Sequence, residues 1–92
     1  MFVSMTVHKA HPGKEALLLE MMHRYGEAGK GQPGLQQLHV LRDATRGELI
    51  GLTLWDNEAA MTAYRNTAQA TLQDNGFEAL PEPIRAYTFE EA

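Results

Sequence analysis

The sequence predicts a single α+β domain in which a four-stranded antiparallel sheet carries two helices on one face. Three observations lead to this fold class. Four short runs alternate apolar and polar residues, as strands do, and two longer runs repeat apolar residues at helical spacing. The six runs follow one another in the order strand, helix, strand, strand, helix, strand. The 92 residues leave room for one domain, 1–92, with one core.

The first strand and the first helix are predicted in the N-terminal third of the chain. In FVSMTVH, residues 2–8, odd-numbered positions share one face and even-numbered positions share the other. Pro12 suits the start of a helix, and the glycines and proline of GKGQPG end one. Between residues 14 and 30 an apolar stripe recurs at i, i+3, i+4 and i+7. Its members are Leu18, Met21, Met22, Tyr25 and Ala28.

The remaining elements follow from the same signals. LQQLHVLRD (35–43) and ELIGLTLW (48–55) are strands separated by ATRG, a gap of hairpin length. Asp56 or Asn57 is a suitable N-cap for the second helix, and Glu58 lies in its first turn, where the helix dipole favours negative charge. DNG (74–76) predicts the helix exit, FEALPEP (77–83) a loop, and IRAYTFE (84–90) the last strand. The second apolar stripe comprises Met61, Tyr64, Ala68 and Leu72.

With a hairpin between the middle strands, the order β-α-β-β-α-β is the split βαβ, or ferredoxin-like, arrangement. Two helices cover one face of such a sheet and leave the other open. The third strand is nevertheless apolar on both alternations, with Ile50, Leu52 and Leu54 on one side and Leu49 and Trp55 on the other. Strands apolar on both faces are buried on both faces. We therefore expect the open face to meet a second copy of the chain in a homodimer.

Composition limits the partners and the chemistry. The formal net charge is −4 and the eight basic residues are scattered, so we expect no nucleic-acid binding. The absence of cysteine removes disulfides, thiolate metal sites and cysteine nucleophiles. The N-terminal MFVSMTVHKA has no basic leader, and no apolar run approaches the roughly 18 residues of a membrane span. We expect a cytoplasmic protein that binds neither membrane nor metal.

Three motifs in this order resemble the antibiotic biosynthesis monooxygenase family of the dimeric α+β barrel superfamily. They are HPGKEALLLEMM after the first strand, GQPGLQQLHVLRD at the hairpin, and LWDNEAAMTAYR after the third strand. The resemblance covers nearly the whole chain. It implies a dimeric α+β barrel and, in some members, oxidation of phenols, quinols or anthrones without a cofactor. Other members degrade haem, isomerise small metabolites or have no established reaction.

Departures from the family pattern narrow these implications. Haem-degrading members use an asparagine, a tryptophan and a histidine where this chain has Thr6, Tyr64 and Asp74. The resemblance therefore does not imply haem degradation here. Many members also have a glutamate two residues before the tryptophan that ends the third strand, and this chain has Thr53 there.

Two aromatic residues have both a structural and a functional interpretation. Trp55 fits a core position at the corner between strand and helix, and the alternative is an apolar pocket wall. Tyr64 lies on the second helical stripe, so its hydroxyl needs a partner, either a backbone group or a substrate oxygen. Met22, Tyr25 and Met61 would line the same pocket if one exists.

The histidines are candidates for a base, because oxidation of a phenol begins with removal of a proton. His39 lies within the second strand and His8 at the end of the first, and each also fits a solvent-exposed strand position. His23 falls on the polar side of the first helix. His8 and His11 form an H-x-x-H motif, but the strand end and Pro12 keep them off a common helical face, so metal binding is not expected.

These observations lead to one functional expectation and one alternative. The first is a cofactor-independent monooxygenase acting on a small electron-rich aromatic molecule, with His39 or His8 as base and Tyr64 orienting the substrate. Trp55, Tyr25, Met22 and Met61 would surround the substrate ring. The alternative is a non-catalytic dimer that binds a small apolar ligand or acts in a stress response. A core without a cavity would favour neither the monooxygenase nor the ligand-binding dimer.

Overall fold

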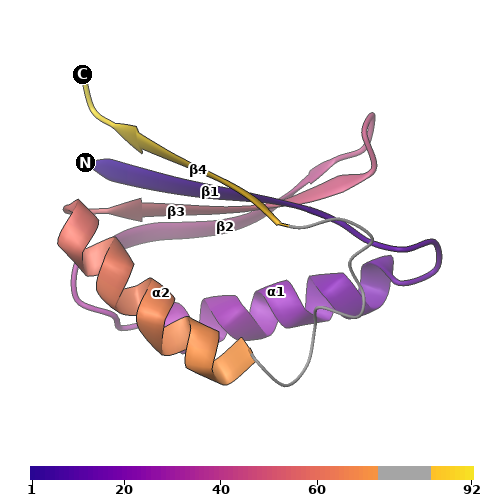
Figure 1. The fold of residues 1–92 in the computed structure, drawn as a ribbon, viewed down its shortest axis with the longest axis horizontal. Coiled ribbons are helices and arrows are strands. Elements are labelled where there is room, and N and C mark those ends of the chain that lie inside the picture. Colours follow the sequence, from indigo (N-terminus) through magenta and orange to yellow (C-terminus); the bar gives the residue numbers. More distant parts are fainter. Residues whose placement is uncertain (73–83) are drawn as a thin grey trace.

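The computed structural model describes residues 1–72 and 84–92, and for residues 67–72 only the helical backbone. Its elements are β1 (Phe2–Lys9), α1 (Glu15–Gly29), β2 (Leu35–Asp43), β3 (Glu48–Trp55), α2 (Glu58–Leu72) and β4 (Arg85–Glu90). The strands form one antiparallel sheet in the order β2-β3-β1-β4. Both helices lie on the same side of this sheet (Figure 1). The predicted ferredoxin-like α+β fold is confirmed.

The boundaries agree with the sequence to within one residue at most strand and helix ends. The predicted turn at 74–76 and loop at 77–83 fall outside the described residues. The structure also decides the open question at the start of α2. Asn57 is the N-cap, because its Oδ1 accepts a hydrogen bond from the backbone N–H of Ala60 at 2.9 Å. Asp56 instead accepts a hydrogen bond from Gln36 Nε2 at 2.8 Å, which ties the helix start to β2.

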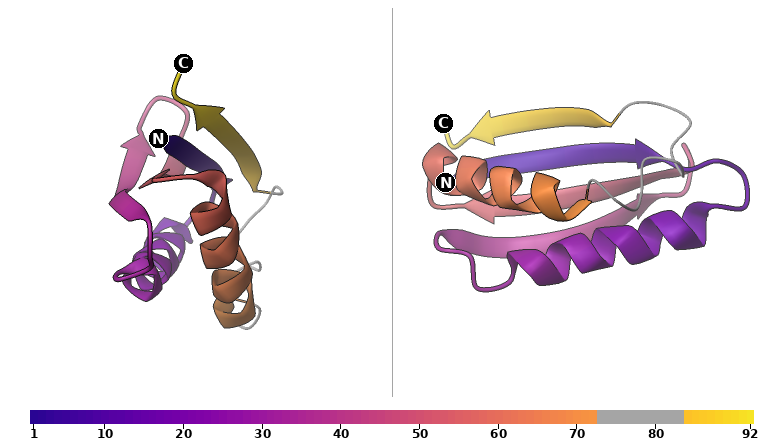
Figure 2. Two further views of the ribbon diagram at one scale, coloured as in Figure 1. Left: turned by 90° about the vertical axis from the view of Figure 1, so that its left-hand side faces the viewer. Right: turned by 60° about the horizontal axis from the view of Figure 1, so that its bottom comes forward.

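The alternation in β1 and β3 determines which side chains meet the helices. Strand pairing aligns Phe2 with Trp55 and Thr6 with Gly51, and these positions face α1 and α2. The opposite alternation forms a second apolar face, which no helix or strand of the described residues covers (Figure 2). The apolar members of this open face are Val3, Met5, Val7, Leu41, Ile50, Leu52, Leu54, Tyr87 and Phe89.

The core beneath the helices consists of two clusters at opposite ends of the sheet. One cluster lies between the sheet and α2 and comprises Phe2, Trp55, Met61 and Tyr64. Leu18, Met22 and Leu49 form the other, beneath α1. Between these ends, the helix-facing positions of β1 and β3 are small or polar. They are Ser4, Thr6, Gly51 and Thr53.

The contact between the two helices corrects one detail of the predicted stripe on α1. Ala28 was expected to face the sheet but is exposed, and Gly29 is buried in its place. The reason is the ring of Tyr64, because a Cβ built on Gly29 would lie 2.9 Å from Tyr64 Cζ. Only a glycine allows α2 to approach the end of α1 this closely. No helix among the described residues has the length and apolar character to cross a membrane.

We predict that Gly29→Ala lowers the free energy of unfolding by about 1–3 kcal/mol, because the added methyl group overpacks a rigid ring. Gly26→Ala on the same helix is the matched control. Its Cβ would meet Leu38 Cδ2 at 2.9 Å, but this is the end of a flexible side chain that can move. We expect Gly26→Ala to change stability by less than about 1 kcal/mol, because the better helix propensity of alanine offsets the contact. Urea denaturation of both variants measures the free energy of unfolding. Equal losses of stability in the two variants would contradict the conclusion that the Tyr64 ring excludes a side chain at position 29.

Candidate functional site

A cavity of about 400 Å³ lies between the sheet and the two helices. It lies where the helix-facing residues of β1 and β3 are small, so their side chains do not fill the space between the sheet and the helices. Its walls are mostly apolar, with a few polar residues from the two helices and from β1, β2 and β3. This volume falls in the range of small-molecule sites in proteins. Among the described residues the polar members of the lining are Ser4, Thr6, His8, His39, Thr53, Tyr25, Tyr64 and Arg65.

His8 is half-buried and faces the helices from the end of β1. Its Nε2 lies 2.8 Å from the hydroxyl oxygen of Thr6, two residues earlier on the same face of the strand. Gly51 on β3 leaves room for this pair, since a Cβ there would come within 2.8 Å of Thr6 Oγ1. The Thr6 hydroxyl thereby holds the imidazole at the edge of the cavity.

The second ring nitrogen of His8 is in a different situation. Its Nδ1 is covered and has no hydrogen-bond partner. Protonating the ring would bring a positive charge into this half-buried position, where one ring nitrogen has no partner, and this is unfavourable. Burial accordingly lowers the pKa of His8 below its ordinary value of 6.5. The imidazole is therefore neutral at neutral pH, as a base must be before it accepts a proton.

Tyr64 and Trp55 form the packed corner between β3 and α2. The Tyr64 hydroxyl donates a hydrogen bond to the backbone carbonyl of Tyr25 at 2.8 Å, and burial raises its pKa above the ordinary value of 10.0. Its ring lies over Trp55 with centroids 5.1 Å apart. Trp55 has an exposed fraction of 0% and is absent from the cavity lining, so it supports the cavity from behind Tyr64.

Thr53, on the helix-facing side of β3, is hydrogen-bonded to the tryptophan. Its hydroxyl accepts a hydrogen bond from Trp55 Nε1 at 2.8 Å and lies 3.5 Å from the carbonyl oxygen of Ser4, to which it donates. Both Ser4 and Thr53 line the cavity. The indole N–H is thus satisfied within the chain.

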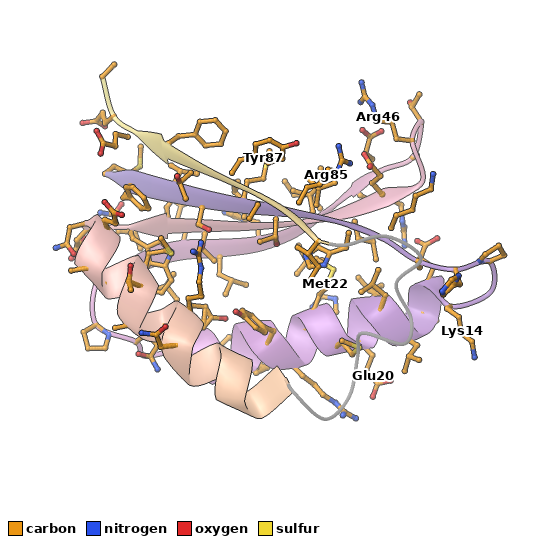
Figure 3. The ribbon with its side chains drawn as sticks, in the orientation of Figure 1. Lys14, Glu20, Met22, Arg46, Arg85 and Tyr87 are labelled. Carbon is orange, nitrogen blue, oxygen red and sulfur yellow. The ribbon has the colours of Figure 1, made fainter. Side chains whose placement is uncertain are left out.

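The three remaining predicted pocket residues come together at the cavity. Met22 from α1 and Met61 from α2 are both buried, and Tyr25 is half-buried. All three belong to the lining. Figure 3 shows Met22 extending from α1 toward the sheet. Burial raises the pKa of Tyr25, while the nearby charge of Arg65 acts in the opposite direction.

The structure separates His39 from the other candidates. Its strand partner is Leu52, on the open face, whereas its neighbour Val40 pairs with Gly51 and faces the helices. The imidazole is exposed, and its Nε2 lies 3.0 Å from Gln37 Oε1 on the same open face. His39 therefore borders the cavity through its place in β2, while its ring lies on the other side of the sheet from His8.

The other histidines lie apart from the cavity. His11 and His23 are both exposed, the former in the β1–α1 turn and the latter on α1. Among residues 1–72 and 84–92, no three His, Asp or Glu side chains gather closely enough to hold a metal ion.

Arg65 is a charged residue of the cavity lining that the sequence analysis did not single out. It follows Tyr64 on α2 and is half-buried in the lining. The available signal was its spacing, because Arg65 is four residues after Met61 and so falls on the helical stripe that faces the sheet. A charged residue on such a stripe is unusual in a small domain.

Comparison with known proteins identifies the family. The model of the antibiotic biosynthesis monooxygenase family matches residues 1–71. The chain therefore belongs to the antibiotic biosynthesis monooxygenase family. A search of curated proteins gives no match.

Solved structures share this fold at low sequence identity. A protein of Nitrosomonas europaea assigned as an antibiotic biosynthesis monooxygenase aligns with a TM-score of 0.87 and 15% identity, over 99% of this chain and 98% of that one. Rv0793 of Mycobacterium tuberculosis aligns with a TM-score of 0.83 and 14% identity, over 99% of this chain and 94% of that one. The haem degrader MhuD of the same organism, with two haems in its active site, aligns with a TM-score of 0.79 and 18% identity. The alignment covers 99% of this chain and 95% of that one. At these identities the likeness shows the fold alone.

We predict that His8 makes the stability of the protein depend on pH. In the unfolded chain its imidazole titrates near 6.5, and in the folded chain at a lower pH. The unfolded state therefore takes up this proton first, and the free energy of unfolding should fall as the pH drops below about 6.5. Denaturation between pH 5.5 and 7.5 measures the effect, with a slope of at most about 1.4 kcal/mol per pH unit for one proton.

Two variants separate this effect from general acid sensitivity. His8→Asn should flatten the dependence, whereas His23→Asn on the exposed side of α1 should leave it unchanged. Equal slopes in all three proteins would show that the imidazole of His8 is not held neutral by burial.

Proposed function

We propose that this chain is a cofactor-independent monooxygenase that oxidises a small electron-rich aromatic molecule, of the phenol or quinol type, in the cavity beneath the helices. Family membership supports the reaction class. The observation that carries the proposal is the combination of mostly apolar walls with a neutral, half-buried imidazole at their edge. An apolar cavity of this kind suits an aromatic ring and keeps water away from reactive intermediates.

In this proposal His8 is the base. Its Nδ1 is covered, so Nε2, beside Thr6 Oγ1, is the nitrogen left to receive a proton. A phenol hydroxyl that reaches Thr6 is also within reach of His8 Nε2. The lowered pKa of His8 keeps the ring ready to accept a proton at neutral pH and makes the imidazolium short-lived. His39 is not assigned this role, because its ring lies on the open face.

The chemistry needs no external reductant. Deprotonation gives an electron-rich phenolate, which transfers one electron to dioxygen and leaves a phenoxyl radical and superoxide. Their combination at a ring carbon forms a peroxide, which takes back the proton from His8 and then loses water to leave a quinone. One oxygen atom of O₂ enters the product and the other leaves as water. The substrate supplies all of the electrons.

The walls of the cavity have separate tasks in this proposal. Met22, Met61 and Tyr25 contact the ring of the substrate. We assign Tyr64 to packing rather than to orienting the substrate, because its hydroxyl proton is engaged by the carbonyl of Tyr25. Trp55 supports Tyr64 from beneath.

The alternative function is a dimer that binds a small apolar ligand without reacting, or that acts in a stress response. One observation favours it. The Tyr64 hydroxyl and His8 Nε2 are both already paired within the chain, so these polar groups of the cavity do not require a substrate oxygen. Haem degradation is not proposed. The first position of the haem-degrading pattern is Thr6, which is engaged with His8, and the third is Asp74, which lies outside the described residues.

We predict that the protein catalyses oxygen uptake with a phenol or quinol in the presence of a metal chelator. His8→Asn should lower kcat/KM by about 10²- to 10⁴-fold, the usual contribution of a positioned base. Tyr64→Phe should leave kcat/KM unchanged while lowering stability by about 0.5–1.5 kcal/mol, the worth of one hydrogen bond. Oxygen-electrode traces, corrected for autoxidation with heat-denatured protein, measure the rates. Full activity in His8→Asn would exclude His8 as the base, and ligand binding without oxygen uptake would favour the alternative.

We further propose that the chain forms a homodimer through its open face. Several apolar side chains of this face are exposed, including Leu41 at 45%, Tyr87 at 41% and Phe89 at 49%. Figure 3 shows Tyr87 on the side of the sheet away from the helices. The ion pair between Arg85 and Glu48 bounds the same face at its hairpin end. A second copy with the same face would cover this apolar surface by two-fold symmetry.

Light scattering at micromolar concentration should give about twice the chain mass of 10.3 kDa. Phe89→Lys should shift the protein toward monomer, because a charge would be buried in the interface. Leu17→Lys is the matched control, since Leu17 on α1 is exposed to a similar extent, 45%, but lies on a helix. A monomeric wild type would refute the proposed homodimer. Dissociation by Leu17→Lys would place the interface elsewhere than on the open face.

A further inference from the structure

Arg65 departs from the packing of α2 in a way that points to a ligand. It lies one residue after Tyr64 and four after Met61, and both of these neighbours are buried against the sheet. Arg65 is itself half-buried and belongs to the cavity lining. An apolar residue at this position would extend the core cluster. An arginine instead brings a positive charge to the edge of a mostly apolar cavity, where covering that charge is unfavourable unless an anion compensates it.

The other arginines of the chain all have such compensation. Each of the four forms an ion pair with a carboxylate at the surface, whereas the described part of the chain shows no ion pair for Arg65. The four pairs are Arg24–Glu20, Arg42–Glu15, Arg46–Asp43 and Arg85–Glu48. Arg65 stands near Tyr25, because burial raises the pKa of Tyr25 and the positive charge of Arg65 offsets part of that rise. Its guanidinium is therefore available to a group that enters the cavity.

The charges around the cavity agree with this interpretation. Its lining, as far as the structure describes it, contains no Asp or Glu, and Arg65 is its sole Lys or Arg. His8 is neutral at neutral pH, because burial lowers its pKa. The cavity is thus positively charged in a chain whose net charge is −4. No acidic side chain among the described residues of the lining offsets the charge of Arg65.

We propose that the cavity selects an aromatic ligand that carries an oxyanion, in the simplest case a carboxylate, and that Arg65 pairs with this oxyanion. The planar guanidinium offers two parallel N–H donors to the two oxygens of a carboxylate. The ring of the ligand then lies against Met22, Met61 and Tyr25. This inference rests on the proposed use of the cavity for an aromatic ring. It adds the charge of the ligand and the residue that recognises it.

The test compares two probes of almost the same shape, 2-naphthoate and 2-naphthamide, by isothermal titration calorimetry at pH 7.5. The carboxylate should bind wild-type protein at least tenfold more tightly than the amide. Arg65→Gln should remove this preference and leave the affinity for the amide nearly unchanged. Arg24→Gln is the control, because Arg24 is an exposed arginine on α1 whose loss should not affect either probe. Binding alone is measured, so the result does not depend on whether the protein oxidises its ligand.

A second variant addresses the possibility that Arg65 is needed for folding. Arg65→Met should retain a melting temperature at or above that of the wild type, because a partly desolvated charge is replaced by an apolar side chain on the core stripe. It should also bind the amide and lose the preference for the carboxylate. A lower melting temperature in Arg65→Met would show a structural role for Arg65 and would overturn the inference.

Two outcomes of the binding experiment would also overturn it. Equal affinities of the two probes for the wild type, or a preference that persists in Arg65→Gln, would refute the anion site and leave the oxidation of neutral phenols intact. If neither probe binds the wild type, the ligand cavity itself falls, and the proposed monooxygenase function falls with it.

Discussion

The side chain of Tyr64 holds the two helices and the sheet in their mutual positions. Its ring lies over Trp55 of β3 and meets the ring of Tyr25 of α1 edge-on, with centroids 5.2 Å apart. Its hydroxyl donates to the backbone of the same α1 residue. Gly29 permits this approach, since any side chain there would occupy the space of the ring. The mutual positions of β3, α1 and α2 therefore depend on one aromatic residue. If it moved, the distance between α1 and α2 would change, and the size of the cavity with it.

The cavity follows from the distribution of side-chain size along two paired strands. On the helix-facing side of β1 and β3, the large residues lie at the ends, where Phe2 pairs with Trp55 and His8 with Leu49. Between them lie the pairs Ser4–Thr53 and Thr6–Gly51, which cannot reach the helices. The helices are supported at both ends and span the gap between them. The hydroxyl groups of Thr6 and Thr53 form hydrogen bonds with His8, Trp55 and the Ser4 carbonyl, so they remain satisfied in an otherwise apolar space.

The architecture could be predicted from the sequence because it depends on local patterns. Alternation in 2–8 and 48–55 and helical spacing in 14–30 each persist over enough residues to identify an element and its apolar side. The pattern of β3 likewise indicated that the sheet is apolar on both faces. These features need no knowledge of what lies opposite.

The site could be predicted only in part, because its members are defined by what they face. His8 and His39 looked equivalent as strand histidines, and only the pairing of β2 with β3 shows that their rings lie on opposite sides of the sheet. The stripe on α1 was misplaced by one residue at Ala28, since the position of Gly29 is decided by a ring from the other helix. Tyr64 was correctly placed against the sheet, but its hydrogen-bond partner is a carbonyl 39 residues away in the sequence. Contacts of this range leave no local pattern.

Two polar groups remain uncompensated by the described residues, and both belong to residues that line the same cavity. One is Nδ1 of His8, which is covered and has no partner. The other is the guanidinium of Arg65, which lies on a stripe that otherwise packs against the sheet and forms no ion pair there. Each costs stability, and an apolar residue at either position would remove that cost. In a small domain with little stability to spare, departures from good packing are expected to collect where function requires them. Their shared location therefore supports the proposal that this cavity, rather than the open face of the sheet, binds a ligand.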